Sequence, residues 1–217
     1  MKYSYLTFDC YGTLIDWRTG IEAELRRALG DVGIGGQELL DAYVNAEKEQ
    51  ESTYKRYREV VRLTALSLSG RLGVAVTENA AREFAASVPR WPAFPDTKKF
   101  LREMGSRGYK RYILSNVDND LLEGTIQANG LELDGFVTAE EVGSYKPNPG
   151  HWLRFMEKTG SAKGEILHCA QSLFHDVAPT QSMGIASAWV NRYGERLNPA
   201  LEPSIICDSL TSLSSIL

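Results

Sequence analysis

The chain has 217 residues, 43% of them apolar and 24% charged, and its 28 acidic and 24 basic side chains give a formal net charge of −4. This length and composition are typical of a globular protein that folds around its own core, without the disulfides or structural metal of small scaffolds. Because the balance is acidic and Lys and Arg form no block, the composition argues against nucleic acid and anionic membranes as partners.

Cysteine usage and hydropathy predict a cytoplasmic protein. The three cysteines are widely spaced in apolar segments, which is typical of reduced thiols in a core: Cys10, Cys169 and Cys207. The apolar run at 3–8 is too short for a signal peptide, and no later run approaches the roughly 18 residues of a membrane span. The three histidines form no HxH or HxxxH pair, so a zinc enzyme has little support.

The first predicted element is a buried strand at 3–8, which ends at Asp9 and runs into a turn at Gly12. The following stretch, about 16–88, carries helical patterns in succession and no convincing strand. Its apolar residues recur at helical spacing: Ile21, Leu25 and Ala28, then Leu39, Leu40 and Tyr43, then Val60, Val61, Thr64 and Leu68. The sequence therefore predicts an all-helical subdomain inserted after the first strand as a lid.

Residues 88–96 lead out of this insertion. They contain three prolines, which fix φ and predict a stiff extended connector before a helix that Asp96 caps. The predicted division is a core of 1–15 with 96–217 and a helical cap of 16–95.

Beyond the connector, β-rich runs alternate with helical patterns. The runs lie at 111–114, 135–138, 166–170, 187–190 and 204–207. Apolar residues at helical spacing lie between the earlier ones: Phe100, Leu101 and Met104, then Leu121, Leu122 and Ile126, then Trp152, Phe155 and Met156. This alternation predicts the α/β class, with a doubly wound, Rossmann-like parallel sheet and crossover helices on its faces.

Ligands of open α/β sheets bind beyond the carboxyl ends of the strands, so polar residues that end apolar runs are the candidate site. Four such stretches occur: Asp9-Cys10-Tyr11-Gly12-Thr13, Ser115-Asn116, Lys146-Pro147-Asn148-Pro149, and Ala170-Gln171-Ser172 continuing to His175-Asp176. Cys10 is expected in the core, because neighbouring residues of an extended segment point to opposite faces. His175 is expected to pack or hydrogen-bond beside Asp176.

In order and spacing, these stretches resemble the four motifs of the haloacid dehalogenase superfamily, with Asp9, Ser115, Lys146 and Asp176 at motifs one to four. The resemblance covers essentially the whole chain, including the position of the helical insertion. It implies covalent catalysis by a carboxylate. Asp9 is then the nucleophile, Lys146 keeps Asp9 ionised and offsets an anionic substrate, and Asp176 orients or deprotonates the hydrolytic water.

The same resemblance assigns the remaining candidate residues. Thr13 joins the catalytic group, and four residues are assigned to substrate binding: Tyr11, Ser115, Asn116 and Ser172. Among these, Ser115 and Asn116 are expected to donate hydrogen bonds to a small anionic substrate. The resemblance also implies a homodimer.

Two positions separate phosphoryl transfer from dehalogenation. Superfamily members that transfer phosphoryl groups usually carry a second Asp two residues after the nucleophile, where this chain has Tyr11, and an Asp early in motif four, where it has the neutral Gln171. Their absence removes a general acid and much of the charge that holds Mg²⁺, so we expect neither metal nor cofactor. The string Asp-x-Tyr-Gly-Thr-Leu is instead similar to the L-2-haloacid dehalogenases, which implies hydrolysis of short 2-haloalkanoic acids to 2-hydroxy acids.

Two features depart from that family. Its members carry a cap Arg that is implicated in receiving the halide, whereas this sequence has no Arg between Arg27 and Arg56. Lys48 or the cluster at 54–58 are the candidate replacements. The family's motif four reads Ser-Ser-Asn before its final Asp, and here one more residue precedes Asp176.

Three alternatives stay open. The first is a Mg²⁺-dependent phosphatase of the same superfamily that acts on a small phosphomonoester. The second is a hydrolase that breaks a carbon–nitrogen bond to open a strained cyclic amino acid. The third is a non-catalytic binding protein that keeps the scaffold.

Overall fold

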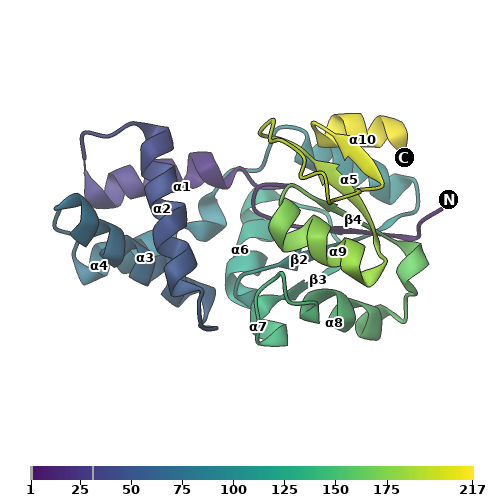
Figure 1. Cartoon of the computed structure of the whole chain (residues 1–217), viewed down its shortest axis with the longest axis horizontal. Coiled ribbons are helices and arrows are strands. Elements are labelled where there is room, and N and C mark those ends of the chain that lie inside the picture. Colours follow the sequence, from purple (N-terminus) through teal and green to yellow (C-terminus); the bar gives the residue numbers. More distant parts are fainter. Residues whose placement is uncertain (1, 31) are drawn as a thin grey trace. The chain divides into compact units, whose positions relative to one another are not determined.

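The computed structural model describes residues 2–30 and 32–217. The chain divides into two compact units (Figure 1), an α/β unit of 1–16, 93–116 and 130–217 and a helical unit of 17–92 and 117–129. The sequence-based boundaries differ by a few residues at each junction, and they assign 117–129 to the core. In the described residues no helix combines the length and apolar character needed to cross a membrane.

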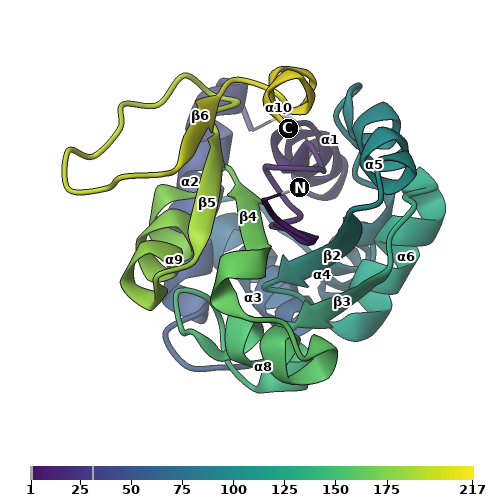
Figure 2. The same cartoon turned by 90° about the vertical axis from the view of Figure 1, so that its right-hand side faces the viewer.

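Six parallel strands form the sheet of the α/β unit, in the order β3-β2-β1-β4-β5-β6 (Figure 2). Their bounds are β1 (Tyr5–Phe8), β2 (Lys110–Ser115), β3 (Gly135–Thr138), β4 (Ile166–Ala170), β5 (Ala186–Val190) and β6 (Ile205–Cys207). Each predicted strand overlaps one of these, and the predicted doubly wound parallel sheet is confirmed. The strand order reverses between β1 and β4, so the crevice expected at a switch point lies beside Asp9.

Helices cover both faces of this sheet (Figure 2). One face carries α5 (Thr97–Ser106) and α10 (Leu210–Ile216), and the other carries α8 (Gly150–Thr159) and α9 (Ala178–Met183). The shorter helices of the unit are α7 (Ala139–Val142), the 3-10 helix η2 (Lys163–Glu165) and the π-helix η3 (Leu173–Val177). A buried apolar cluster fills the α8 face: Leu114, Val137, Trp152, Phe155, Ile166 and Ile185.

Alternation along β1 decides which side chains face the site. Phe8 packs edge-on against an aromatic ring of α5, and Tyr5 packs edge-on against Phe155 of α8. Because alternate residues of a strand share a face, Thr7 and Asp9 point to the α8 side with Tyr5. Cys10 points the other way and is fully buried, as expected for a core thiol.

The helical unit contains α1 (Trp17–Leu29), α2 (Gly36–Gln50), α3 (Tyr57–Leu72), α4 (Glu78–Ala85), the 3-10 helix η1 (Val88–Arg90) and α6 (Asn119–Asn129). The helical patterns predicted after the first strand correspond to α1, α2 and α3, and the all-helical insertion is confirmed. Helix α4 was missed because it has only eight residues and its buried side chains span little more than one turn. Asp118 explains why the following helix α6 belongs here: its carboxylate accepts hydrogen bonds from the Tyr57 and Arg58 N–H groups at 2.9 Å each and so caps α3.

The connector after α4 differs from its prediction in two ways. Its first residues form η1 rather than an extended chain, because Pro89 is tolerated in the first turn of a helix. Asp96 precedes α5 but its side chain does not cap that helix. Its carboxylate instead accepts hydrogen bonds from the Leu210 and Thr211 N–H groups at 2.9 and 3.3 Å, so it caps α10.

Arg192 connects this cap to the loop that follows β1. Its guanidinium binds both carboxylate oxygens of Asp96, at 2.9 and 3.1 Å, and donates twice to the Thr13 carbonyl, at 2.8 and 3.0 Å. It also stacks on the Phe94 ring at 4.0 Å. The side chains of the pair are only 7% and 16% exposed. Removing the arginine therefore leaves a largely buried carboxylate without its partner.

We expect Arg192→Ala to lower the free energy of unfolding by about 3 kcal/mol, because breaking a buried ion pair on one side is strongly destabilising. Urea denaturation measures this change. Arg102→Ala is the matched control, since Arg102 and Glu132 form a pair that is 73% and 55% exposed. That control should shift stability by less than about 0.5 kcal/mol, and equal effects of the two variants would contradict the argument.

Candidate active site

Lys146 is the centre of the candidate site. Its Nζ donates to Asp9 Oδ1 at 2.9 Å, to Asp176 Oδ1 at 2.7 Å and to the Leu114 carbonyl at 2.9 Å. The lysine side chain is 1% exposed, Asp176 is 0% exposed and Asp9 is 12% exposed. The predicted convergence of motifs one, three and four is therefore present, and Asp9 is its outermost member.

Thr13 fixes the second oxygen of Asp9. A turn at Gly12, with φ of 102°, folds the chain back so that Thr13 Oγ1 lies 3.0 Å from Asp9 Oδ2. The same hydroxyl accepts a hydrogen bond from the Gln171 N–H at 2.9 Å. Because that N–H occupies a lone pair of the hydroxyl, the Thr13 proton is directed to the carboxylate. Both oxygens of Asp9 are thus held by donors.

Burial and charge act differently on the three ionisable groups. Burial opposes ionisation of all three, but the two carboxylates raise the pKa of Lys146, and Lys146 with His168 holds the pKa of Asp176 well below its usual range. For Asp9, burial and the negative charge of Asp176 raise the pKa, against the opposing effect of Lys146 and Thr13. Lys146 acts on Asp9 in the expected direction, yet burial outweighs it. Of these two carboxylates, Asp9 is consequently the first to take up a proton as the pH falls.

The last residue of β2, Ser115, and the residue after it, Asn116, have different surroundings. Ser115 is buried, and its Oγ has no hydrogen-bond partner among the described residues. Asn116 uses its amide to hold the backbone of Lys146, accepting from the Lys146 N–H at 2.7 Å and donating to its carbonyl at 3.1 Å. Asn116 therefore positions the lysine. The expectation that Ser115 and Asn116 also bind substrate stays a prediction.

The π-helix η3 accommodates the one additional residue that motif four has before Asp176. In a π-helix the hydrogen bond spans five residues, and here the Val177 N–H donates to the Ser172 carbonyl at 3.2 Å. The wider turn accommodates one more residue than an α-turn and still brings Asp176 to Lys146. Ser172 begins the turn, with its Oγ accepting from the His175 N–H at 3.0 Å. In this structure Ser172 acts as a cap, and its assignment to substrate stays a prediction.

His168 is a contact that the sequence analysis missed. Its Nε2 lies 2.8 Å from Asp176 Oδ1, whereas His175, the expected neighbour of that carboxylate, contacts Ser172. A lone histidine inside an apolar strand gives no strong signal. The only usable signal was strand alternation. His168 lies on β4 opposite Thr7 of β1, which places it on the same face as Asp9.

The helical unit holds a half-buried carboxylate on α2. Glu47 Oε1 accepts hydrogen bonds from the hydroxyls of Tyr43 and Tyr57, at 3.0 and 2.8 Å. Burial raises the pKa of Glu47, and burial together with the Glu47 charge raises the pKa of Glu51 to about 8. This part of α2 therefore carries acidic groups in the region where the sequence lacks an arginine.

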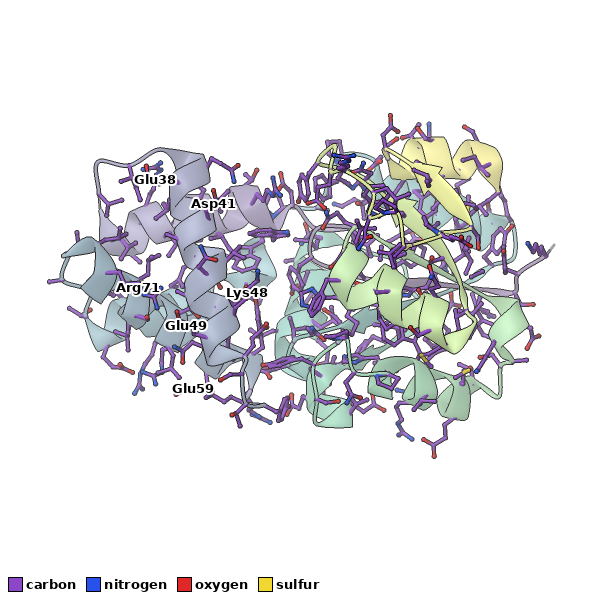
Figure 3. The ribbon with its side chains drawn as sticks, viewed as in Figure 1. Glu38, Asp41, Lys48, Glu49, Glu59 and Arg71 are labelled. Atoms are coloured by element: carbon purple, nitrogen blue, oxygen red, sulfur yellow. The ribbon has the colours of Figure 1, made fainter. Side chains whose placement is uncertain are left out.

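The candidate replacements for that arginine lie mostly in ion pairs or on the surface. Arg58 pairs with Asp120 at 2.6 Å, and Lys48 is exposed. Figure 3 shows the charged side chains of α2 and α3, which include Glu38, Asp41, Lys48, Glu49, Glu59 and Arg71. Arg71 forms an ion pair with Glu49. That Lys48 or the cluster at 54–58 replaces the family arginine stays a prediction.

The donor set beside Asp9 is poor in metal ligands. In the described part of the chain, no group of three or more His, Cys, Asp or Glu side chains is arranged to hold a metal ion. Lys146 Nζ lies within hydrogen-bond distance of one oxygen of each of the two carboxylates, Asp9 and Asp176. Tyr11, at the position of the phosphatases' second Asp, is half-buried and bridges to Ile15.

Comparison with known proteins identifies the family. A family model of haloacid dehalogenase-like hydrolases matches residues 3–169. The chain belongs to this family. Among curated proteins, haloacetate dehalogenase H-2 of Moraxella sp. (strain B) is 24% identical over 89% of this chain and 88% of its own length. (S)-2-haloacid dehalogenase 4A of Burkholderia cepacia is 24% identical over 96% of this chain and 91% of its own.

This haloacid dehalogenase-like hydrolase also resembles solved structures over its full length. The L-2-haloacid dehalogenase from Xanthobacter autotrophicus superposes with a TM-score of 0.88 at 22% identity, covering 99% of this chain and 98% of that one. The likeness confirms the fold. Together with the family match and the curated relatives, it makes the protein a hydrolase with the haloacid dehalogenase fold.

Proposed function

We propose that this hydrolase removes halide from short 2-haloalkanoic acids and releases 2-hydroxy acids, without a metal or cofactor. The observation that carries the proposal is Lys146 bridging Asp9 and Asp176, with Asp9 the most exposed of the three. A carboxylate held by this lysine can attack the carbon of an anionic substrate without a metal ion between the two. The names of the curated relatives, which refer to haloacetate and (S)-2-haloacids, support the substrate class.

The first step forms an ester on Asp9. A carboxylate oxygen of Asp9 attacks carbon 2 of the haloacid, the new carbon–oxygen bond forms, and the carbon–halogen bond breaks as halide leaves with the electron pair. Halide needs no proton, so a tyrosine at position 11 can stand where phosphatases use an acid. Lys146 stays charged through this step and offsets the substrate carboxylate.

The second step hydrolyses the ester. Water attacks Cγ of Asp9 and passes one proton to Asp176. The acyl–oxygen bond then breaks, and Asp176 returns that proton to the departing alkoxide, which leaves as the 2-hydroxy acid. The product hydroxyl oxygen therefore comes from Asp9, and the oxygen of water enters the Asp9 carboxylate. Lys146, which donates to both carboxylates, is placed to stabilise the negative charge that develops on the ester oxygen.

Ser115 is the group proposed to bind the substrate carboxylate. Its buried hydroxyl ends β2, next to the strand that bears Asp9, and has no partner among the described residues. A buried donor without an acceptor is costly unless a ligand supplies one. A bound haloacid carboxylate would do so.

A halide-release screen tests the proposed function. The substrates are chloro-, bromo- and fluoroacetate and both enantiomers of 2-chloropropionate, each assayed with and without EDTA, with Asp9→Asn as control. We expect halide release from at least one of these acids at the same rate in EDTA. Phosphomonoester hydrolysis that EDTA abolishes, with no halide release, would overturn the proposal in favour of a phosphatase.

The missing arginine favours a second candidate. The stretch between Arg27 and Arg56 lacks the family's halide-receiving residue, and α2 there carries the half-buried Glu47 carboxylate instead. The same Asp9 nucleophile could break the carbon–nitrogen bond of a strained cyclic amino acid. Product analysis separates the candidates, because this reaction gives a ring-opened hydroxy amino acid and no halide.

A further inference from the structure

A hydrogen-bond network runs from Asp9 through three buried residues to Thr7. Lys146 Nζ joins Asp9 to Asp176 Oδ1, His168 Nε2 lies 2.8 Å from the same Asp176 oxygen, and His168 Nδ1 lies 2.9 Å from Thr7 Oγ1. Thr7 lies on β1 and Asp9 follows directly after it, so the network begins and ends at the same strand. His168, Thr7 and Asp176 are all 0% exposed.

The chemistry of the acceptor fixes the proton on His168. An ionised carboxylate has only lone pairs to offer, and the pKa of Asp176 lies well below its usual range, so Nε2 must carry the hydrogen of this contact. Thr7 Oγ1 at Nδ1 prevents the ring from rotating away. Trp152 adds an edge-on packing contact, with ring centroids 5.2 Å apart.

The two oxygens of Asp176 are consequently unequal. Oδ1 accepts from both Lys146 and His168, whereas Oδ2 is buried and has no partner among the described residues. A carboxylate held by Lys146 alone could rotate about its terminal bond, because such torsions have broad minima. Two donors from different directions at one oxygen determine where the other oxygen points.

We propose that His168, fixed by Thr7, is a positioning residue for ester hydrolysis: it orients Asp176 so that Oδ2 stays free to accept the proton of the hydrolytic water. This role rests on the proposed function. It affects the second step and leaves the first, in which Asp9 attacks, nearly unchanged. Nothing in the motif pattern of the sequence assigns a role to either residue.

His168→Gln and His168→Asn form a matched pair of variants. The amide nitrogen of Gln can occupy the place of Nε2 and donate to Asp176, whereas that of Asn reaches only the place of Nδ1. Both variants lose the ring and its packing on Trp152, so a purely structural role would affect them alike. The difference between them isolates the hydrogen bond to Asp176.

The chemical test mixes enzyme in excess with L-2-chloropropionate, quenches with acid at intervals, and measures the Asp9 ester by intact-protein mass. We expect His168→Asn to slow ester decay on the order of 10²-fold, as misorientation of a catalytic group does, with ester formation little changed. His168→Gln should restore decay to near the wild-type rate. Thr7→Val should slow decay, and Thr7→Ser should restore it.

The outcomes separate this role from the proposed function. If the wild type and every variant form no ester from any haloacid of the screen, the proposed function fails and the role of His168 fails with it. If ester forms but decays equally in the Gln and Asn variants, the role alone is overturned. Nitrogen-15 NMR of the ligand-free protein gives a readout without substrate, since a His168 Nε2 that carries no proton would also overturn it.

Discussion

Asp9→Asn is expected to reduce halide release by about 10⁴-fold or more, because removal of an attacking group leaves only binding and orientation to act on the reaction. An amide at this position is isosteric and its oxygen can still accept from Lys146, so the folded structure should persist. Steady-state halide release measures the loss, and thermal unfolding confirms the fold. A variant that keeps more than a few per cent of activity would exclude Asp9 as the nucleophile.

Heavy-oxygen water provides the direct evidence for the ester. In a single turnover with enzyme in excess, the label should enter the Asp9 carboxylate, and the 2-hydroxy acid should carry the unlabelled oxygen of Asp9. Peptide mass analysis locates the label. Label found directly in the product would mean that water attacks the substrate itself.

Cys10→Ala is the control for a neighbouring nucleophile. Cys10 follows Asp9 in sequence but lies on the other face of the sheet, and burial together with the Asp9 charge raises the pKa of its thiol well above the usual value. A thiol kept neutral in an apolar environment is inert. Ester formation in Cys10→Ala should therefore match the wild type, and its loss would point to the sulfur.

The fold could be predicted from sequence because its signals are local. The six strands are short apolar runs bounded by polar residues, and α5, α6 and α8 show apolar residues at helical spacing, so these elements were visible by themselves. Helix α6 shows what such local signals cannot predict, namely the unit to which an element belongs. Its spacing predicts a helix, but only the capping of α3 by Asp118 assigns it to the helical unit, and that contact joins residues about sixty positions apart.

The candidate site was predicted only in part for the same reason. Asp9 was found because it ends a predicted strand, and the carboxyl ends of parallel strands are where ligands bind. Lys146 and Asp176 were assigned through the resemblance to the family's motifs three and four. His168 lies inside a strand, where a histidine is indistinguishable from a core residue until the register with Thr7 is known. Asp96 was assigned to the helix that follows it, although its carboxylate reaches a helix that begins more than a hundred residues later. Long-range pairings of this kind leave no local pattern.

Asp176→Asn is expected to form the Asp9 ester and to slow its hydrolysis by about 10²- to 10⁴-fold, the contribution of a general base. The amide oxygen can accept hydrogen bonds from Lys146 and His168 as the carboxylate does, so the hydrogen-bond network stays in place. The general base itself is lost. Intact-protein mass should show the ester accumulating during turnover. Asp120→Asn, which changes a carboxylate that is 64% exposed and belongs to the helical unit, should turn over without accumulation.

The same variant tests the electrostatics of the site. Since burial and the negative charge of Asp176 raise the pKa of Asp9, ester formation in the wild type should decline at a higher pH than for an ordinary carboxyl group as the solution is acidified. The substituted amide carries no charge, so Asp176→Asn should lower the pKa of Asp9 and move this decline to lower pH. Single-turnover ester formation between pH 3 and 8 measures the shift. A shift to higher pH would mean that Asp176 does not act on Asp9 through its charge, and that the coupling through Lys146 dominates instead.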